Sequence, residues 1–245
     1  MKVGLFVTCL VDLMRPSIGF AALKLLEEAG CEVLVPAGQT CCGQPGYNSG
    51  DRQAAQALAK KLVQEFDACE YVVIPSGSCA GMIATHYTEL LSEFPPWQEK
   101  ARALSKKTFE LTDFLVNVLK IETVPGRFDG SITYHDACSG LRELNIKNQP
   151  RNLLAKIPGL TLKEMHQPEQ CCGFGGTFAV KYGEISSRIA DLKCEDVQSA
   201  GADALVLGDL GCMLNIEGRL RRRGDSRTRV LHVAEVLAGM GGGEK

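Results

Sequence analysis

Cysteine is the residue type whose spacing points most directly to chemistry in this sequence. The chain of 245 residues contains eleven cysteines, and eight of them form one pattern that occurs twice. Each copy has a single cysteine, then an adjacent pair followed by glycine, then another single cysteine. The first copy is Cys9, Cys41, Cys42 and Cys79, and the second is Cys138, Cys171, Cys172 and Cys212. Corresponding cysteines are 129 to 133 residues apart, which indicates an internal duplication.

The expected redox environment bears on whether these cysteines are free thiols. Residues 1–10 contain one lysine and a short apolar run, but they lack the longer apolar core and the cleavage site of a signal peptide. No stretch approaches the roughly 20 apolar residues of a membrane span. The net charge of −2 provides no basic field for nucleic acid. We therefore expect a cytoplasmic protein with reduced thiols, no transmembrane segment and no nucleic-acid partner.

Metal ligation explains eight cysteines in register better than packing or disulfides do. A free cysteine packs as a small apolar residue, and a disulfide between adjacent cysteines closes a strained ring. Four thiolates suit either zinc or an iron–sulfur cluster. Structural zinc usually takes cysteines two to four residues apart, whereas here the only close pair is adjacent. A cluster offers several irons to neighbouring side chains, so we expect up to two clusters of the [4Fe–4S] type, with zinc as the alternative.

Short apolar runs alternate with amphipathic segments along the chain. We expect buried strands at residues 3–8, 32–35, 71–74, 132–135, 161–163, 204–207 and 230–233. We expect helices at 20–29, 51–66, 80–93, most of 97–124, 182–200 and a last short helix after 233, and a loop at 36–50. This alternation predicts an α/β fold of two pseudo-equivalent units with mainly parallel sheets, residues 1–125 and 126–245.

The predicted strands also suggest where the cysteines meet. Cys9, Cys79, Cys138 and Cys212 each follow the end of a predicted strand, and the adjacent pairs lie in loops. Ligand sites of parallel sheets lie beyond the carboxyl ends of the strands. We therefore expect the four cysteines of each copy to converge at one edge of one sheet.

The doubled motif resembles the cysteine-rich (CCG) domain. That family is found twice in a heterodisulfide reductase polypeptide, in the glycolate oxidase iron–sulfur subunit and in the small lactate-utilisation proteins. The resemblance covers residues 2 to about 236. Residues 6–9, 134–138 and 171–178, together with the lack of an attached ferredoxin-like domain, make the chain most similar to the lactate-utilisation group.

The resemblance implies an iron–sulfur electron-transfer subunit of an oxidoreductase complex that oxidises L-lactate to pyruvate. Its implied partners are further iron–sulfur lactate-utilisation subunits, and its implied substrate is a small 2-hydroxy acid. Two alternatives belong to other classes. One is a heterodisulfide-reductase-like enzyme acting on thiols or disulfides, and the other is a zinc-stabilised interaction module without a redox role.

One departure from the family pattern concerns the end of each repeat. In heterodisulfide reductase this ending is Cys-x-x-Cys, and five cysteines hold a non-cubane cluster. Here Ser76 and Asp209 replace the first cysteine of that ending. Four ligands per repeat suit an ordinary [4Fe–4S] cluster, or a cluster in which water, Ser76 or Asp209 ligates one iron. Disulfide-reduction chemistry is correspondingly disfavoured.

Several other residues have a chemical and a structural interpretation. His135 and Asp136 shortly precede Cys138, so His135 is either a catalytic proton donor beside the cluster or a cap of the strand end. We assign structural or surface roles to the remaining histidines, His86, His166 and His232, and packing roles to Cys31, Cys69 and Cys194. Six arginines between residues 219 and 229 are typical of a solvated face, with docking of an acidic electron-transfer partner as the alternative.

Overall fold

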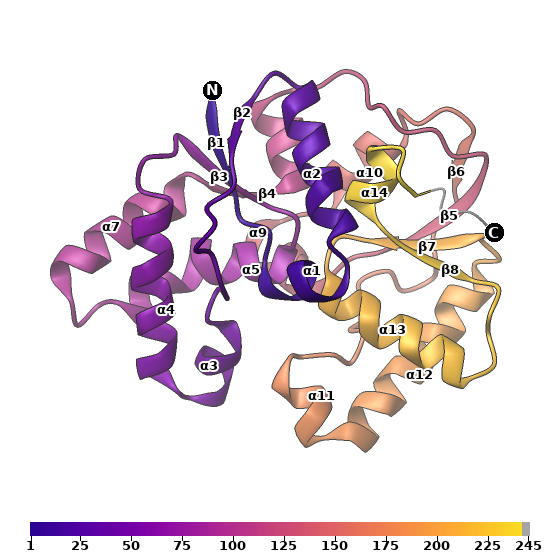
Figure 1. Cartoon of the computed structure of the whole chain (residues 1–245). Helices are drawn as coiled ribbons and strands as arrows, with labels where there is room; N and C mark the ends of the chain where they lie inside the picture. The colour runs from indigo at the N-terminus through magenta and orange to yellow at the C-terminus, as the bar shows by residue number, and fades with distance from the viewer. Residues whose placement is uncertain (242–245) are drawn as a thin grey trace.

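The computed structural model describes residues 1–241, which form two similar α/β units (Figure 1). The first unit has a four-stranded parallel sheet with the order β2-β1-β3-β4. Its strands are β1 (Lys2–Leu5), β2 (Glu32–Leu34), β3 (Tyr71–Ile74) and β4 (Thr108–Glu110). Its helices are α1 (Cys9–Met14), α2 (Ser17–Glu28), α3 (Gln44–Ser49), α4 (Arg52–Glu65), α5 (Gly77–Gly81), α6 (Tyr87–Leu90), α7 (Pro95–Lys106) and α8 (Leu111–Asp113), with π-helical turns η1 (Met82–His86) and η2 (Phe114–Val118).

The second unit repeats this topology with the sheet order β6-β5-β7-β8, again all parallel. Its strands are β5 (Gly130–His135), β6 (Leu160–Leu162), β7 (Ala204–Leu207) and β8 (Arg229–His232). Its helices are α9 (Cys138–Leu144), α10 (Asn148–Leu154), α11 (Thr177–Lys181), α12 (Gly183–Ser199), α13 (Leu210–Arg222) and α14 (Val233–Leu237). The predicted α/β class with two parallel sheets is confirmed. The first sheet is complete at Glu110 and the second begins at Gly130, and a boundary at residue 125 stays a prediction.

Side-chain alternation along the strands buries both faces of the first sheet. Val3, Leu5 and Val73 belong to the apolar cluster that includes α2. Val72 and Ile74 point to the other face and belong to the cluster formed with α4 and α7. A strand covered on both faces is apolar at nearly every position, which is why these runs could be identified from the sequence.

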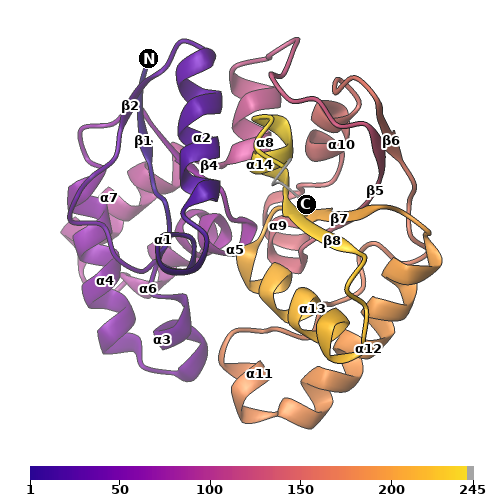
Figure 2. The same ribbon diagram turned by 45° about the vertical axis from the view of Figure 1, so that its right-hand side comes forward.

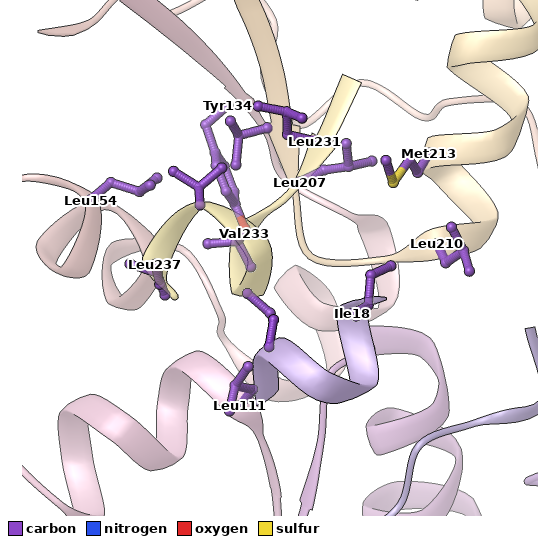
Figure 3. Packing of buried hydrophobic residues seen from close by; sticks show 14 of the residues in the cluster. Ile18, Leu111, Tyr134, Leu154, Leu207, Leu210, Met213, Leu231, Val233 and Leu237 are labelled. Atoms are coloured by element: carbon purple, nitrogen blue, oxygen red, sulfur yellow. The ribbon is translucent and has the colours of Figure 1, made fainter. Parts of the chain in front are cut away.

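The larger apolar cluster joins the two units into one core (Figure 3). Ile18 of α2 and Leu111 of α8 belong to the first unit, and they pack in the same cluster as Val233 and Leu237 of α14. Helix α2 lies beside α14 in both ribbon views (Figures 1 and 2). The two units are therefore held together by apolar side chains that each unit would expose if it stood alone.

Two stretches differ from the sequence-based expectation. Most of residues 97–124 is helical, as predicted, in α7, α8 and η2. Within this stretch, however, residues 108–110 form β4, which pairs with β3. The strand was missed because three residues carry too little pattern to stand out between helical segments. The stretch 36–50 was predicted to be a loop, but it contains α3, which begins after Gly43 in a left-handed conformation (φ 83°).

Several helices that follow strand ends were not predicted, including α9 and α13, which begin near the cysteines of the second unit. The single helix expected at 80–93 is divided into α5, the π-helical turn η1 and α6. Within residues 1–241, no helix combines the length and the apolar character needed to cross a membrane.

Candidate metal centres

The sheet topology brings the four cysteines of each copy to one place. Cys9 begins α1 directly after β1, and Cys79 lies in α5 directly after β3. Strands β1 and β3 are neighbours, and the chain order reverses between them because β2 and β4 flank them on opposite sides. A crevice forms at such a switch point beyond the carboxyl ends of the strands. The pair Cys41-Cys42 reaches the same crevice from the segment that follows β2.

The first cysteine set forms a continuous chain of sulfur contacts. Cys9 and Cys42 both lie close enough to Cys41 to lower the pKa of its thiol, and Cys42 Sγ lies 3.4 Å from Cys79 Sγ. The backbone N–H of Gly43 donates to Cys41 Sγ at 3.4 Å. Four sulfurs are thus gathered in one cluster, and the adjacent pair contributes two of them.

The second set repeats this arrangement after β5 and β7. Cys138 and Cys172 both lie close enough to Cys171 to lower the pKa of its thiol, and Cys212 lies close enough to Cys172 to affect the pKa of that thiol. Backbone N–H groups of Gly173 and Phe174 donate to Cys171 Sγ and Cys172 Sγ, each at 3.4 Å. Gly173 has φ 87°, and a Cβ there would lie 2.6 Å from the carbonyl oxygen of Ser186. Glycine is therefore required for the turn that presents these N–H groups to the sulfurs.

One thiol in each set is strongly acidified by its neighbours. Hydrogen bonds from Cys42 and Cys9 lower the pKa of Cys41 to about 3, with a further contribution from the Gly43 N–H. Hydrogen bonds from Cys138 and Cys172 lower the pKa of Cys171 to about 2. Thiolate is the form of cysteine that binds metals. Both sets therefore have the donors and the polarisation of a metal or cluster site.

His135 is the residue that distinguishes the second set from the first. It ends β5, is 1% exposed, and its Nδ1 lies 3.2 Å from the carbonyl oxygen of Pro168. A ring nitrogen of His135 and the sulfurs of Cys172 and Cys212 all lie within 4.8 Å of one another. Burial, with the positive charge of Lys193 as a second cause, lowers the pKa of His135 to about 3. A catalytic role for His135 stays a prediction.

Asp136 and Lys193 complete the charged surroundings of this second set. The Asp136 carboxylate is paired through both oxygens with Arg151, at 2.7 and 3.0 Å. Lys193 is fully buried on α12, and its ammonium donates to the carbonyl of Gln167 at 2.5 Å. Burial lowers the pKa of Lys193. Sequence reasoning missed Lys193, because a lysine in an amphipathic helix normally faces solvent.

Ser76 and Asp209 contact each other across the interface between the units. Asp209 Oδ2 accepts from Ser76 Oγ at 3.1 Å and from Ser78 N at 2.9 Å. Asp209 Oδ1 accepts from Gly211 N at 3.1 Å and caps α13. Ser76 Oγ accepts from Cys79 N at 3.4 Å and caps α5. These oxygens already have partners, so a structural role is favoured over metal ligation.

Two adjoining cavities lie between the cysteine sets. One has a volume of about 310 Å³ and is lined by the first set together with Phe174, Thr177 and Val180 of the second unit. The other has a volume of about 120 Å³ and is lined by the second set together with Gln44 and Asn48 of the first unit. Both cavities share the lining residues Gln44, Asn48, Ser78, Phe174, Gly176 and Asp209. Helices α3 and α11 approach each other at this end of the molecule (Figure 2).

The structure assigns mainly structural contacts to the remaining candidates. Cys31, Cys69 and Cys194 are buried in the apolar clusters. His232 is buried and caps α14, whereas the side chain of His166 is 81% exposed. Within the arginine-rich stretch, Arg219 and Arg223 both pair with Asp191. This part of the stretch is an ion-paired helix face rather than an open cationic patch.

Comparison with known proteins identifies close relatives along nearly the whole chain. The sequence profile of the cysteine-rich (CCG) domain matches residues 3–84 and 132–217. The chain is 47% identical over 237 residues to "Lactate utilization protein A" of Bacillus subtilis (strain 168), covering 97% of this chain and 99% of that protein. It is equally similar, at 47% identity, to the protein of the same name from Halalkalibacterium halodurans, covering 97% of this chain and 96% of that one.

A solved structure shares the fold at low sequence identity. The crystal structure of a hypothetical protein from Helicobacter pylori superposes with a TM-score of 0.68 at 17% identity. The match covers 100% of this chain and 49% of that longer chain. The arrangement of two such units therefore also occurs within a longer protein.

Proposed function

The chain belongs to the cysteine-rich (CCG) domain family, and on that premise we propose that it is an iron–sulfur electron-transfer subunit of a lactate-utilising complex. Its relatives are named lactate utilization protein A. In this proposal the complex oxidises L-lactate to pyruvate, and further iron–sulfur subunits pass the electrons on. The eight repeated cysteines hold the clusters: Cys9, Cys41, Cys42, Cys79, Cys138, Cys171, Cys172 and Cys212.

One observation carries the proposal: two sets of four sulfurs line adjoining cavities at the junction of the two units. A 2-hydroxy acid releases two electrons on oxidation, and iron–sulfur clusters accept and release single electrons when bound. Two sets in one chain match that stoichiometry. Their common position at one junction supports transfer between them.

The donor sets fit iron–sulfur clusters better than zinc. Each set includes an adjacent cysteine pair, whose two sulfurs suit neighbouring irons of a cluster. Backbone N–H groups point at sulfurs in both sets, and such hydrogen bonds tune the potentials of bound clusters. Ser76 and Asp209 stand where heterodisulfide reductase has an additional cysteine, and here they cap helices. Because neither residue supplies a thiolate, the heterodisulfide-reductase-like alternative is disfavoured.

We place the 2-hydroxy acid in the larger cavity, close to both sets. A volume of about 310 Å³ is adequate for a molecule of a few heavy atoms. The side-chain amides of Gln44 and Asn48 line it and could donate hydrogen bonds to a carboxylate. Substitution of Asn48 by leucine is then expected to weaken lactate-dependent reduction without lowering the iron content.

Anaerobic purification followed by iron, sulfide and zinc analysis tests the proposal. We expect about eight irons and eight sulfides per chain, corresponding to two four-iron clusters. A reductive titration monitored by EPR should take up about two electrons, one for each cluster. Stoichiometric zinc without sulfide would instead identify a structural or interaction module, and the electron-transfer proposal would be rejected.

A further inference from the structure

We propose that His135 is a metal ligand, so that the second site has a mixed thiolate and imidazole donor set while the first site has thiolates alone. The inference rests on the proposed cluster binding and goes beyond it, because it makes the two sites chemically different. One difference between the two units lies just before the first cysteine of the duplicated pattern. The residue three positions before the first cysteine is Phe6 in one unit and His135 in the other.

Both residues at this position are buried, but only one has a donor atom. Phe6 is fully buried and packs edge-on against Phe66, with ring centroids 6.0 Å apart. His135 is 1% exposed, and its Nε2 has no hydrogen-bond partner among the described residues. Since Phe6 shows that an apolar ring can fill this position, packing alone does not require an imidazole there.

The hydrogen bond at the other ring nitrogen determines the tautomer of His135. Nδ1 lies 3.2 Å from the carbonyl oxygen of Pro168, which can only accept a hydrogen bond. Nδ1 therefore carries the proton, and Nε2 presents a lone pair. Metal-binding histidines are commonly oriented in this way, with the second nitrogen donating to a backbone carbonyl.

The lone pair of Nε2 needs an electrophilic partner. A ring nitrogen of His135 and the sulfurs of Cys172 and Cys212 lie within 4.8 Å of one another. Because Nδ1 is directed at Pro168, we assign this contact to Nε2. Once these cysteines are thiolates, they have no proton to offer to Nε2. An iron of the cluster that Cys172 and Cys212 help to hold is such an electrophilic partner. With His135 the second site offers five donors to four irons, so one iron takes two protein ligands.

His232 shows the opposite arrangement and so serves as an internal comparison. It is also fully buried at the end of a strand, β8, but its Nδ1 accepts a hydrogen bond from Ala234 N at 3.2 Å. Nε2 of His232 therefore carries the proton and has no free lone pair. Of these two buried histidines, only His135 has a ring nitrogen whose lone pair is not already used by a hydrogen bond.

The test compares protein prepared with natural histidine and with ¹⁵N-labelled histidine. Both samples are purified anaerobically and reduced, and the nitrogen couplings of the cluster signal are measured by pulsed EPR. We expect a strong coupling that changes with the isotope, because a ligating nitrogen receives spin density from iron. The wild-type comparison needs no variant, so it does not depend on how a substituted protein folds.

Three variants assign the coupling to a residue. H135F places the first unit's residue in the second unit and should abolish the nitrogen coupling. H135C offers a sulfur in place of nitrogen and should keep the cluster while losing the coupling. H166Q changes an exposed histidine and should leave the coupling unchanged.

Two results would overturn the inference, and they are distinguishable. Clusters in both sites without a histidine coupling, or with one that persists in H135F, would reject ligation by His135 and leave the proposed function intact. Absence of iron and sulfide from the wild-type protein would reject both.

Discussion

Replacing Asp209 with alanine separates a structural role from metal ligation at the position where the family pattern has a cysteine. The carboxylate caps α13 through Gly211 N, and it accepts from Ser76 Oγ and Ser78 N of the other unit. Loss of a helix cap costs about 1 kcal/mol. Two donors left without an acceptor at a buried interface cost about 1 kcal/mol each or more. We therefore expect D209A to lower the free energy of unfolding by about 3 kcal/mol.

The assay is urea unfolding of the metal-free, reduced protein, followed by circular dichroism. S76A is the matched control, because it removes one partner of Asp209 together with the weaker cap of α5. It should cost about 1 kcal/mol. The double variant should cost less than the sum of the two single variants, since both remove the same hydrogen bond.

Iron analysis of D209A supplies the decisive comparison. If Asp209 acts as a cap, the reconstituted variant keeps the wild-type iron content when it is assayed under conditions where it is folded. An unchanged unfolding free energy together with loss of half the iron would refute the capping argument and identify Asp209 as a ligand.

Three further outcomes are expected. C41S should lose about half of the iron, because it removes a thiolate from one of two four-iron sites. C194S should retain all of it, since the Cys194 thiol faces the carbonyl oxygen of Ile216, at 3.9 Å, and contacts no cysteine of the pattern among the described residues. Burial raises the pKa of Glu110 to about 7 in the folded protein, which is above its value in the unfolded chain. As the pH rises, the unfolded chain therefore loses this proton first, and the free energy of unfolding decreases. Between pH 4 and pH 8 the wild type should lose about 3 kcal/mol relative to E110Q, and parallel pH profiles in urea unfolding would contradict this. G173A should destabilise the protein more than G43A. Both glycines have positive φ, but only at Gly173 would an added Cβ lie within 3.0 Å of another atom. Equal unfolding midpoints of the two variants would contradict this steric argument.

The cysteine pattern could be recognised from the sequence because the spacing of residues along the chain does not depend on how the chain folds. Duplication fixes the spacing, and a strand buried on both faces leaves an apolar run that marks where each cysteine follows a strand. The predicted positions of β3 and β7 agree with the structure residue for residue. Strand β4 escaped prediction because three residues contain too little periodicity, although pairing with β3 stabilises it in the folded chain.

The surroundings of His135 illustrate what local sequence could not provide. Its proximity to Cys138 in the sequence suggested a role near the site, but its hydrogen bond to Pro168 and its distance from Cys212 depend on chain segments more than 30 residues away. These contacts are the basis for proposing His135 as a ligand, a role that the sequence did not suggest. Lys193 likewise became relevant only because α12 packs its side chain beneath the second set.

Residue identity and the periodicities within single strands and helices were sufficient to predict the ligand types, their duplication and the α/β class. The way in which the two halves combine emerged only from the folded chain. Ser76 and Asp209 are 133 residues apart and meet at the junction, and the cavities there are lined by both units. Such contacts arise from the packing of surfaces that are distant in the chain, and no local pattern encodes them.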